Sequence, residues 1–108
     1  MKIKLFCFIA IIIFSVNSFS GELIKSASVI EIASHATGNG KNFALRTESG
    51  TGLCTGWIYF FEDQAPSPAT YNQNFTLALT AMAASMKVRI HDYDGDNCTS
   101  ADFLAITK

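Results

Sequence analysis

The sequence has few charged residues and no block of one sign: Asp, Glu, Lys and Arg make up 16% of its 108 residues. The eight lysines and arginines are scattered among nine acidic residues. No basic stripe therefore exists that could displace counterions from a phosphate backbone. We expect no nucleic-acid partner.

A long hydrophobic run is also missing. The longest one, residues 5–14, falls well short of the roughly 20 apolar residues that a membrane-spanning helix needs. Two lysines precede this run, and Ser18 and Ser20 follow it, which is the pattern of a secretory signal peptide cleaved between Ser20 and Gly21. We therefore expect a signal peptide at 1–20, a single mature domain at 21–108 with no membrane span, and a secreted or periplasmic location.

Cysteine is scarce, and one of the three, Cys7, lies near the start of the apolar run and leaves with the signal peptide. It is not at the end of the run, so no lipid anchor is expected. The other two, Cys54 and Cys98, would enter an oxidising compartment and should form a disulfide, although two free buried thiols are the alternative. Removing the twenty leader residues from 108 leaves 88, a size at which a cross-link of about 4 kcal/mol matters.

The hydrophobic period of the mature chain changes from strand-like to helical and back. Residues 23–33, 41–48 and 56–62 favour three strands, with a glycine-rich hairpin turn at 35–40 and a break at 49–52. Closer to the C-terminus, two further segments, 87–91 and 102–107, favour strands four and five.

Between the third and fourth strands the pattern predicts a helix over 74–86. Thr70 and Gln73 have the spacing of a capping box, and Pro66 and Pro68 would end the preceding sheet segment. The apolar stripe expected to face the sheet consists of Phe75, Leu79, Met82 and Met86, flanked by Ala78 and Ala83, while Thr76, Thr80 and Ser85 should face outward.

The order β-β-β-α-β-β predicts a mainly β fold with one helix, a small OB-like barrel with one disulfide. The stretch 77–90, followed by a turn, Cys98 and a last strand, resembles the second half of the B subunits of bacterial AB5 toxins and of short exported bacterial proteins without assigned function. The resemblance covers about residues 40–108 and carries no diagnostic motif. It implies a ring of five domains that binds a host glycan, but no sugar-binding motif can be placed here.

Asp92, Asp94 and Asp96 alternate in an acidic loop, as the first ligands of an EF-hand calcium loop do. The match ends there, because Asn97 replaces the required glycine and Phe103 the closing acid. A polar hairpin turn explains the loop more simply, with a weak calcium site as the minority interpretation. We expect no cofactor and no need for calcium in folding.

Catalytic groups are sparse. Two histidines, His35 and His91, stand apart in the sequence, and Glu62 and Asp63 are adjacent, so on a strand they would point to opposite faces. No nucleophile elbow or reactive cysteine is recognisable. We therefore do not expect an enzyme.

Aromatic residues are the remaining feature, and Trp57, Tyr59 and Tyr93 are the candidate binding residues. Trp57 taken alone is expected in the core, which would turn Ile58 and Phe60 outward; with either parity the strand exposes an apolar strip. We expect an exported, disulfide-stabilised binding module, able to form homo-oligomers, that recognises a glycan or a protein. The alternative is a monomeric periplasmic or envelope protein that inhibits or scaffolds another protein.

Overall fold

The computed structural model describes residues 21–37 and 40–108, and the side chains of 35–37 are not included in that description. The predicted signal peptide and the centre of the predicted hairpin turn therefore lie outside the described residues. Within the described part of the chain, no helix is long and apolar enough to cross a membrane.

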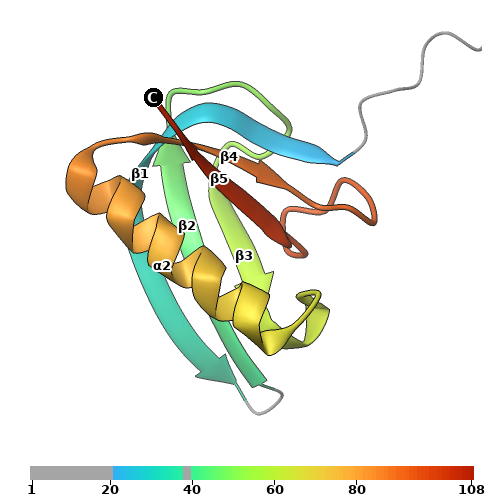
Figure 1. Ribbon diagram of the computed structural model, residues 1–108. Coiled ribbons are helices and arrows are strands. Elements are labelled where there is room, and N and C mark those ends of the chain that lie inside the picture. The colour runs from blue at the N-terminus through green and yellow to red at the C-terminus, as the bar shows by residue number, and fades with distance from the viewer. Residues whose placement is uncertain (1–20, 38–39) are drawn as a thin grey trace, which may run out of the picture.

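The chain folds into five antiparallel strands and one long helix in the order predicted from the sequence (Figure 1). The strands are β1 (Glu22–Thr37), β2 (Gly40–Glu48), β3 (Trp57–Phe61), β4 (Lys87–His91) and β5 (Phe103–Thr107). A short 3-10 helix, η3 (Glu62–Gln64), and the helix α2 (Pro68–Ala84) lie between β3 and β4. Glu62 and Asp63 are thus in η3 and not on a strand.

The strand order in the sheet is β3-β2-β1-β4-β5, and this sheet does not close into a barrel, unlike the predicted OB-like barrel. β3 and β5 form no ladder. The backbone of Tyr59 instead donates to Cys98 O at 2.8 Å and accepts from Ala101 N at 3.1 Å. These two bonds use the segment just before β5, so the edges of the sheet approach each other without strand pairing.

The disulfide between Cys54 and Cys98 is present, as predicted. It joins the loop that precedes β3 to the segment that precedes β5, across the same unpaired edge. Because 44 positions separate the two cysteines, it cross-links the two halves of the domain.

The loop after β2 presses closely against β1. Lys25 and Thr51 exchange two backbone hydrogen bonds of 2.8 and 3.0 Å. At Gly52, whose φ is +147°, an added Cβ would lie 2.3 Å from the carbonyl oxygen of Leu23, so this approach requires glycine. The loop predicted as a simple break is therefore part of the fold.

The helix α2 starts earlier than predicted. Ser67 is its N-cap and accepts a hydrogen bond from the Thr70 N–H at 3.1 Å, while Pro68 occupies the first turn. The capping box that the sequence placed at Thr70 and Gln73 is therefore wrong. Proline is well tolerated at this position because the first N–H groups of a helix have no intrahelical partner.

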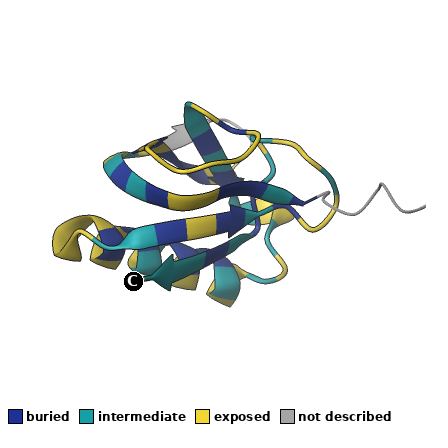
Figure 2. Ribbon diagram, turned by 90° about the horizontal axis from the view of Figure 1, so that it is seen from above, coloured by how far each residue is buried: buried dark blue, intermediate teal, exposed yellow. Residues whose placement is uncertain are grey.

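The face of α2 that packs on the sheet also differs from the predicted stripe. Its buried residues are Tyr71, Asn74, Ala78 and Ala81, whereas Leu79 and Met82 are 45% and 43% exposed. Phe75 and Met86 of the predicted stripe do pack against the core, while the two buried alanines allow the helix backbone to approach the sheet closely. Buried and exposed segments alternate along the helix in Figure 2. Thr76, Thr80 and Ser85 do face outward, as predicted.

The core lies between the sheet and α2. Its largest fully buried side chains include Phe43, Phe60, Leu23, Leu45 and Ile58. Phe43 stacks on Phe60 with ring centroids 4.7 Å apart and contacts Phe75 of the helix edge to face. Since Ile58 and Phe60 point into this core, the alternate residues of β3 must point away from it.

Candidate functional site

A row of three aromatic side chains lies on the outer face of β3. Trp57, Tyr59 and Phe61 are each partly exposed, whereas Ile58 and Phe60 between them are at most 1% exposed. The expectation that Trp57 anchors the core is therefore wrong, and the strand has the opposite parity. The rings of Tyr59 and Phe61 lie 6.3 Å apart with an angle of 23° between their planes. We call Trp57, Tyr59 and Phe61 the aromatic row.

The neighbouring strand supplies small and polar side chains to the same face. Across the β2–β3 ladder, Arg46 is paired with Trp57, Ala44 with Tyr59, and Asn42 with Phe61. Ala44 in the centre has no bulk to cover the rings, and Ala33 of β1 lies opposite it on the other side. Asn42 and Ala44 are themselves buried, at 6% and 4% exposed, so the exposed polar side chain that β2 places beside the row is Arg46, at its Trp57 end.

Arg46 is held in place over Trp57. Its guanidinium carbon lies 5.9 Å from the centroid of the Trp57 ring, a cation–π contact. Its Nε donates to Glu31 Oε1 at 2.8 Å. Both charged side chains are about half exposed, so their ion pair adds little to stability, about 0 to 1 kcal/mol. It does order a cation and a carboxylate beside the ring.

Tyr93, the third binding residue predicted from the sequence, belongs to a different cluster. It is 66% exposed and packs on Phe103 and His91 at centroid distances of 5.7 and 6.1 Å. No aromatic contact joins it to Trp57 or Tyr59 among the described residues. The structure instead adds Phe61 and Arg46 to the site. Phe61 and Arg46 belong to the site because of which alternate residues of β3 and β2 face outward. A single sequence does not determine this choice.

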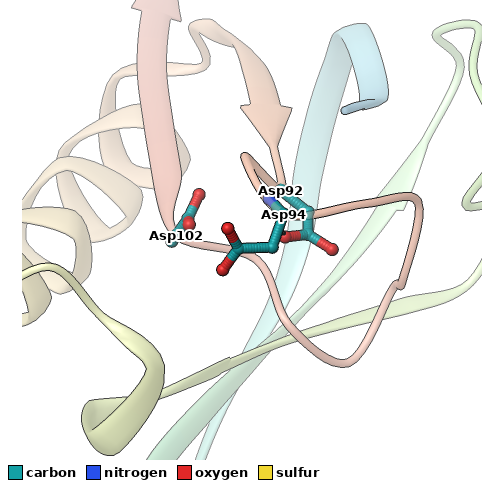
Figure 3. Close-up of side chains that lie close together, drawn as sticks. All are labelled: Asp92, Asp94 and Asp102. Atoms are coloured by element: carbon teal, nitrogen blue, oxygen red, sulfur yellow. Dashed lines mark hydrogen bonds between the residues drawn. The ribbon is translucent and has the colours of Figure 1, made fainter. Parts of the chain in front are cut away.

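The acidic loop after β4 brings together a different set of carboxylates from the predicted one. Ligand oxygens of Asp92, Asp94 and Asp102 lie within 4.8 Å of one another (Figure 3). Asp96 is not part of this group and instead accepts a hydrogen bond from the Gly21 N–H at 2.8 Å. Asp102, one residue before β5, takes the place that the sequence gave to Asp96.

Backbone N–H groups already satisfy the buried carboxylates of this cluster. Asp92 is 2% exposed and accepts from the N–H groups of Asp94 and Asn97 at 3.0 and 3.1 Å. Asp102 is 7% exposed and accepts from the Tyr93 N–H at 3.1 Å. These bonds fold the loop as a turn, which agrees with the structural interpretation preferred from the sequence.

Burial and like charge act together on Asp102. Burial raises the pKa of its carboxyl group, and the negative charges of Asp92 and Asp94 raise this pKa further, while the hydrogen bond from Tyr93 opposes the shift. The direction agrees with three carboxylates that share one small volume and that form no ion pair with a cationic side chain among the described residues.

His91 lies on the opposite side of the β4 end, against Glu22. Its Nε2 is 3.5 Å from Glu22 Oε2, with no hydrogen-bond partner among the described residues. Burial tends to raise the pKa of Glu22, but the hydrogen bond and charge of Arg89, together with the charges of His91 and Lys25, outweigh it and lower this pKa overall. The ring of His91 also packs edge to face on Phe103, with centroids 5.3 Å apart.

A shallow cavity of about 340 Å³ lies between the start of α2 and β2, and Asn42, the ladder partner of Phe61, is among its lining residues. Phe43, Tyr71 and Phe75 form its apolar part. Burial, followed by the charge of Glu62, raises the pKa of Tyr71, so this hydroxyl stays protonated over the physiological range. Ser34, Lys41, Asn42 and Asn72 form the polar part of the cavity.

The chain belongs to a family of unknown function, DUF5992, whose model matches residues 3–108. No curated protein and no solved structure matches the chain. None of these comparisons links it to the AB5 toxin B subunits.

Proposed function

Because family membership assigns no activity to this chain, we propose its function from the aromatic row: an exported, non-enzymatic binding module that recognises a glycan. The observation that carries this proposal is the outward orientation of Trp57, Tyr59 and Phe61 on one strand. Three aromatic side chains that the fold could have buried fully remain partly exposed on one face, and exposed aromatic side chains commonly bind partners.

The groups around the row support a sugar ligand. A sugar ring has apolar faces that stack on aromatic rings and hydroxyl groups that need donors and acceptors. Arg46 and Glu31, both about half exposed, lie at the Trp57 end of the row, so charged hydrogen-bonding groups are available beside the aromatic rings.

Export is part of this proposal. It is supported by the disulfide, which fits an oxidising compartment, and by the sequence pattern of residues 1–20. Secretion and a periplasmic location serve the proposed binding equally well.

A glycan array probed with the mature protein tests the proposal. We expect binding to a restricted set of glycans, lost in Trp57→Ala and weakened about 5- to 150-fold in Tyr59→Ala, if stacking of a sugar on one ring is worth the about 1 to 3 kcal/mol of a stacked base. Tyr93→Ala is the matched control, because it removes an exposed tyrosine outside the row. Equal loss in Tyr59→Ala and Tyr93→Ala, or no glycan bound at all, would contradict the proposal.

A second candidate function, self-association or docking of a protein, is supported by the exposed side of α2. Leu79 and Met82 present apolar side chains to solvent on this helix. Mass under native conditions separates the two candidates. If the exposed side of α2 joins copies of the chain, the wild type should have the mass of an oligomer and Leu79→Glu the mass of a monomer. A wild type that is already a monomer would show that this helix has no role in self-association.

A further inference from the structure

The first described residue, Gly21, is enclosed by the acidic loop although it begins the domain. It is buried, its carbonyl oxygen accepts from the Asp92 N–H at 2.7 Å, and its nitrogen donates to Asp96 Oδ1 at 2.8 Å. Its φ is +103°, and an added Cβ would lie 3.1 Å from the carbonyl oxygen of Asp92. A glycine is therefore needed at this position for the loop to close around it.

The loop that encloses Gly21 is acidic and lacks a side-chain counter-ion. It carries Asp92, Asp94 and Asp96, and Asp102 follows it. None of these four carboxylates forms an ion pair with a lysine, arginine or histidine in the part of the chain that the structure describes. A positive group at the Gly21 nitrogen would supply the missing charge.

We propose that this positive group is the mature N-terminus, and that Asp96 is its dedicated counter-ion. Hydrolysis of the Ser20–Gly21 amide by a signal-processing protease adds water across the C–N bond. Ser20 leaves with a carboxylate, and Gly21 keeps an amine that is protonated at neutral pH, because an α-amino group has a pKa of about 8. The single N–H donor at 2.8 Å from Asp96 becomes an ammonium group at the same place.

The ammonium strengthens the contact because a hydrogen bond between two charged partners is stronger than one from a neutral amide. The burial of Gly21 also sets the order of events, since a protease reaches the Ser20–Gly21 bond most readily before the loop folds around it. Processing during export would therefore come first, and folding would then enclose the new terminus. This inference rests on the proposed export and is independent of glycan recognition.

The experiment compares two chains that have the same net charge. One begins at Gly21, released by a protease that leaves no extra residue, and the other begins at Ser20, which moves the ammonium group away from Asp96. At low ionic strength we expect the equilibrium constant for unfolding to be about three- to fivefold smaller for the Gly21 chain, a modest effect because Asp96 is exposed. The difference should shrink in 1 M salt, where the Debye length is about 3 Å.

Asp96→Asn keeps an oxygen that can accept from the Gly21 nitrogen but removes the charge, so it should abolish the difference between the two chains. Asp94→Asn is the control, because it removes one charge from the same loop without touching Gly21, and it should preserve the difference. No difference between the wild-type chains, or a difference that survives Asp96→Asn, would overturn the proposal. Intact mass of the exported protein supplies a separate readout: a mature chain that starts elsewhere than Gly21 would refute the processing step, whatever the glycan array shows.

Discussion

At the residue scale, the spacing of acidic residues predicted only part of the carboxylate cluster in the acidic loop. Alternate acids at 92, 94 and 96 were recognisable in the sequence, and the turn interpretation agrees with the backbone hydrogen bonds to Asp92. Which carboxylates share one volume could not be predicted, because Asp102 approaches only when β5 pairs with β4. A contact of this kind depends on the sheet and not on the local sequence.

The raised pKa of Asp102 gives a prediction with a definite sign. A carboxyl group whose pKa is higher in the folded than in the unfolded state keeps the folded protein more protonated between the two values. Its contribution to stability is therefore present below the unfolded pKa and is lost as the pH rises through the folded pKa. Asp102→Asn should raise the free energy of unfolding at pH 7 and change it much less in acid.

Glu22→Gln is the control with the opposite sign. The pKa of Glu22 is lowered, so its contribution is present at neutral pH and is lost as the pH falls through the folded pKa. This variant should be less stable than the wild type at pH 7 and should converge with it in acid. Denaturant unfolding from pH 3 to 7 measures both, and two variants that shift in the same direction would refute this electrostatic account.

At the scale of the secondary-structure elements, the sequence predicted the type and order of all five strands and the helix. The segment 87–91 coincides with β4, and the helix was found with a start six residues too late. The phase of the helix was wrong because its sequence carries apolar residues on more than one side. Tertiary packing then selects the alanine side, and nothing within the helix itself records that choice.

The corrected phase predicts which aliphatic residues stabilise the domain. Ile58→Ala in β3 should cost about 2 to 5 kcal/mol, since Ile58 is fully buried in the core. Leu79→Ala removes a side chain of the same size that is 45% exposed and should cost well under 2 kcal/mol. Chemical denaturation of both variants measures the two losses in free energy of unfolding. A larger loss in Leu79→Ala than in Ile58→Ala would contradict the corrected helix phase.

At the scale of the whole molecule, the five-stranded sheet is open, and the connection between its edges is made by the Cys98–Ala101 segment and the disulfide. The expectation of export, which leaves two cysteines in the mature chain, together with a small core sufficed to predict the cross-link. The open edge could not be predicted, because the sequence pattern of five strands does not show whether the two edge strands, β3 and β5, pair with each other. The outward parity of β3, which creates the aromatic row, is fixed at the same scale by the packing of Ile58 and Phe60.

Reduction of the disulfide should therefore weaken the domain as a whole. The chain-entropy argument gives about 4 kcal/mol for a loop of this length, comparable to the net stability of a small domain. We expect the Cys54→Ala, Cys98→Ala double variant to melt much lower than the wild type. Thiol counting on the unreduced, denatured mature protein should find no free sulfhydryl, and two free thiols would contradict the cross-link.

The central claim, that the aromatic row is the ligand-binding face, has a built-in reporter because Trp57 is the sole tryptophan of the chain. Titration of the mature protein with a glycan selected on the array should change the emission of Trp57 in a saturable way, with the same affinity as the array gives. In Tyr59→Ala the midpoint should move to higher glycan concentration, and in Tyr93→Ala it should stay where it is. Saturable binding that leaves the Trp57 emission unchanged would place the ligand elsewhere and contradict the account.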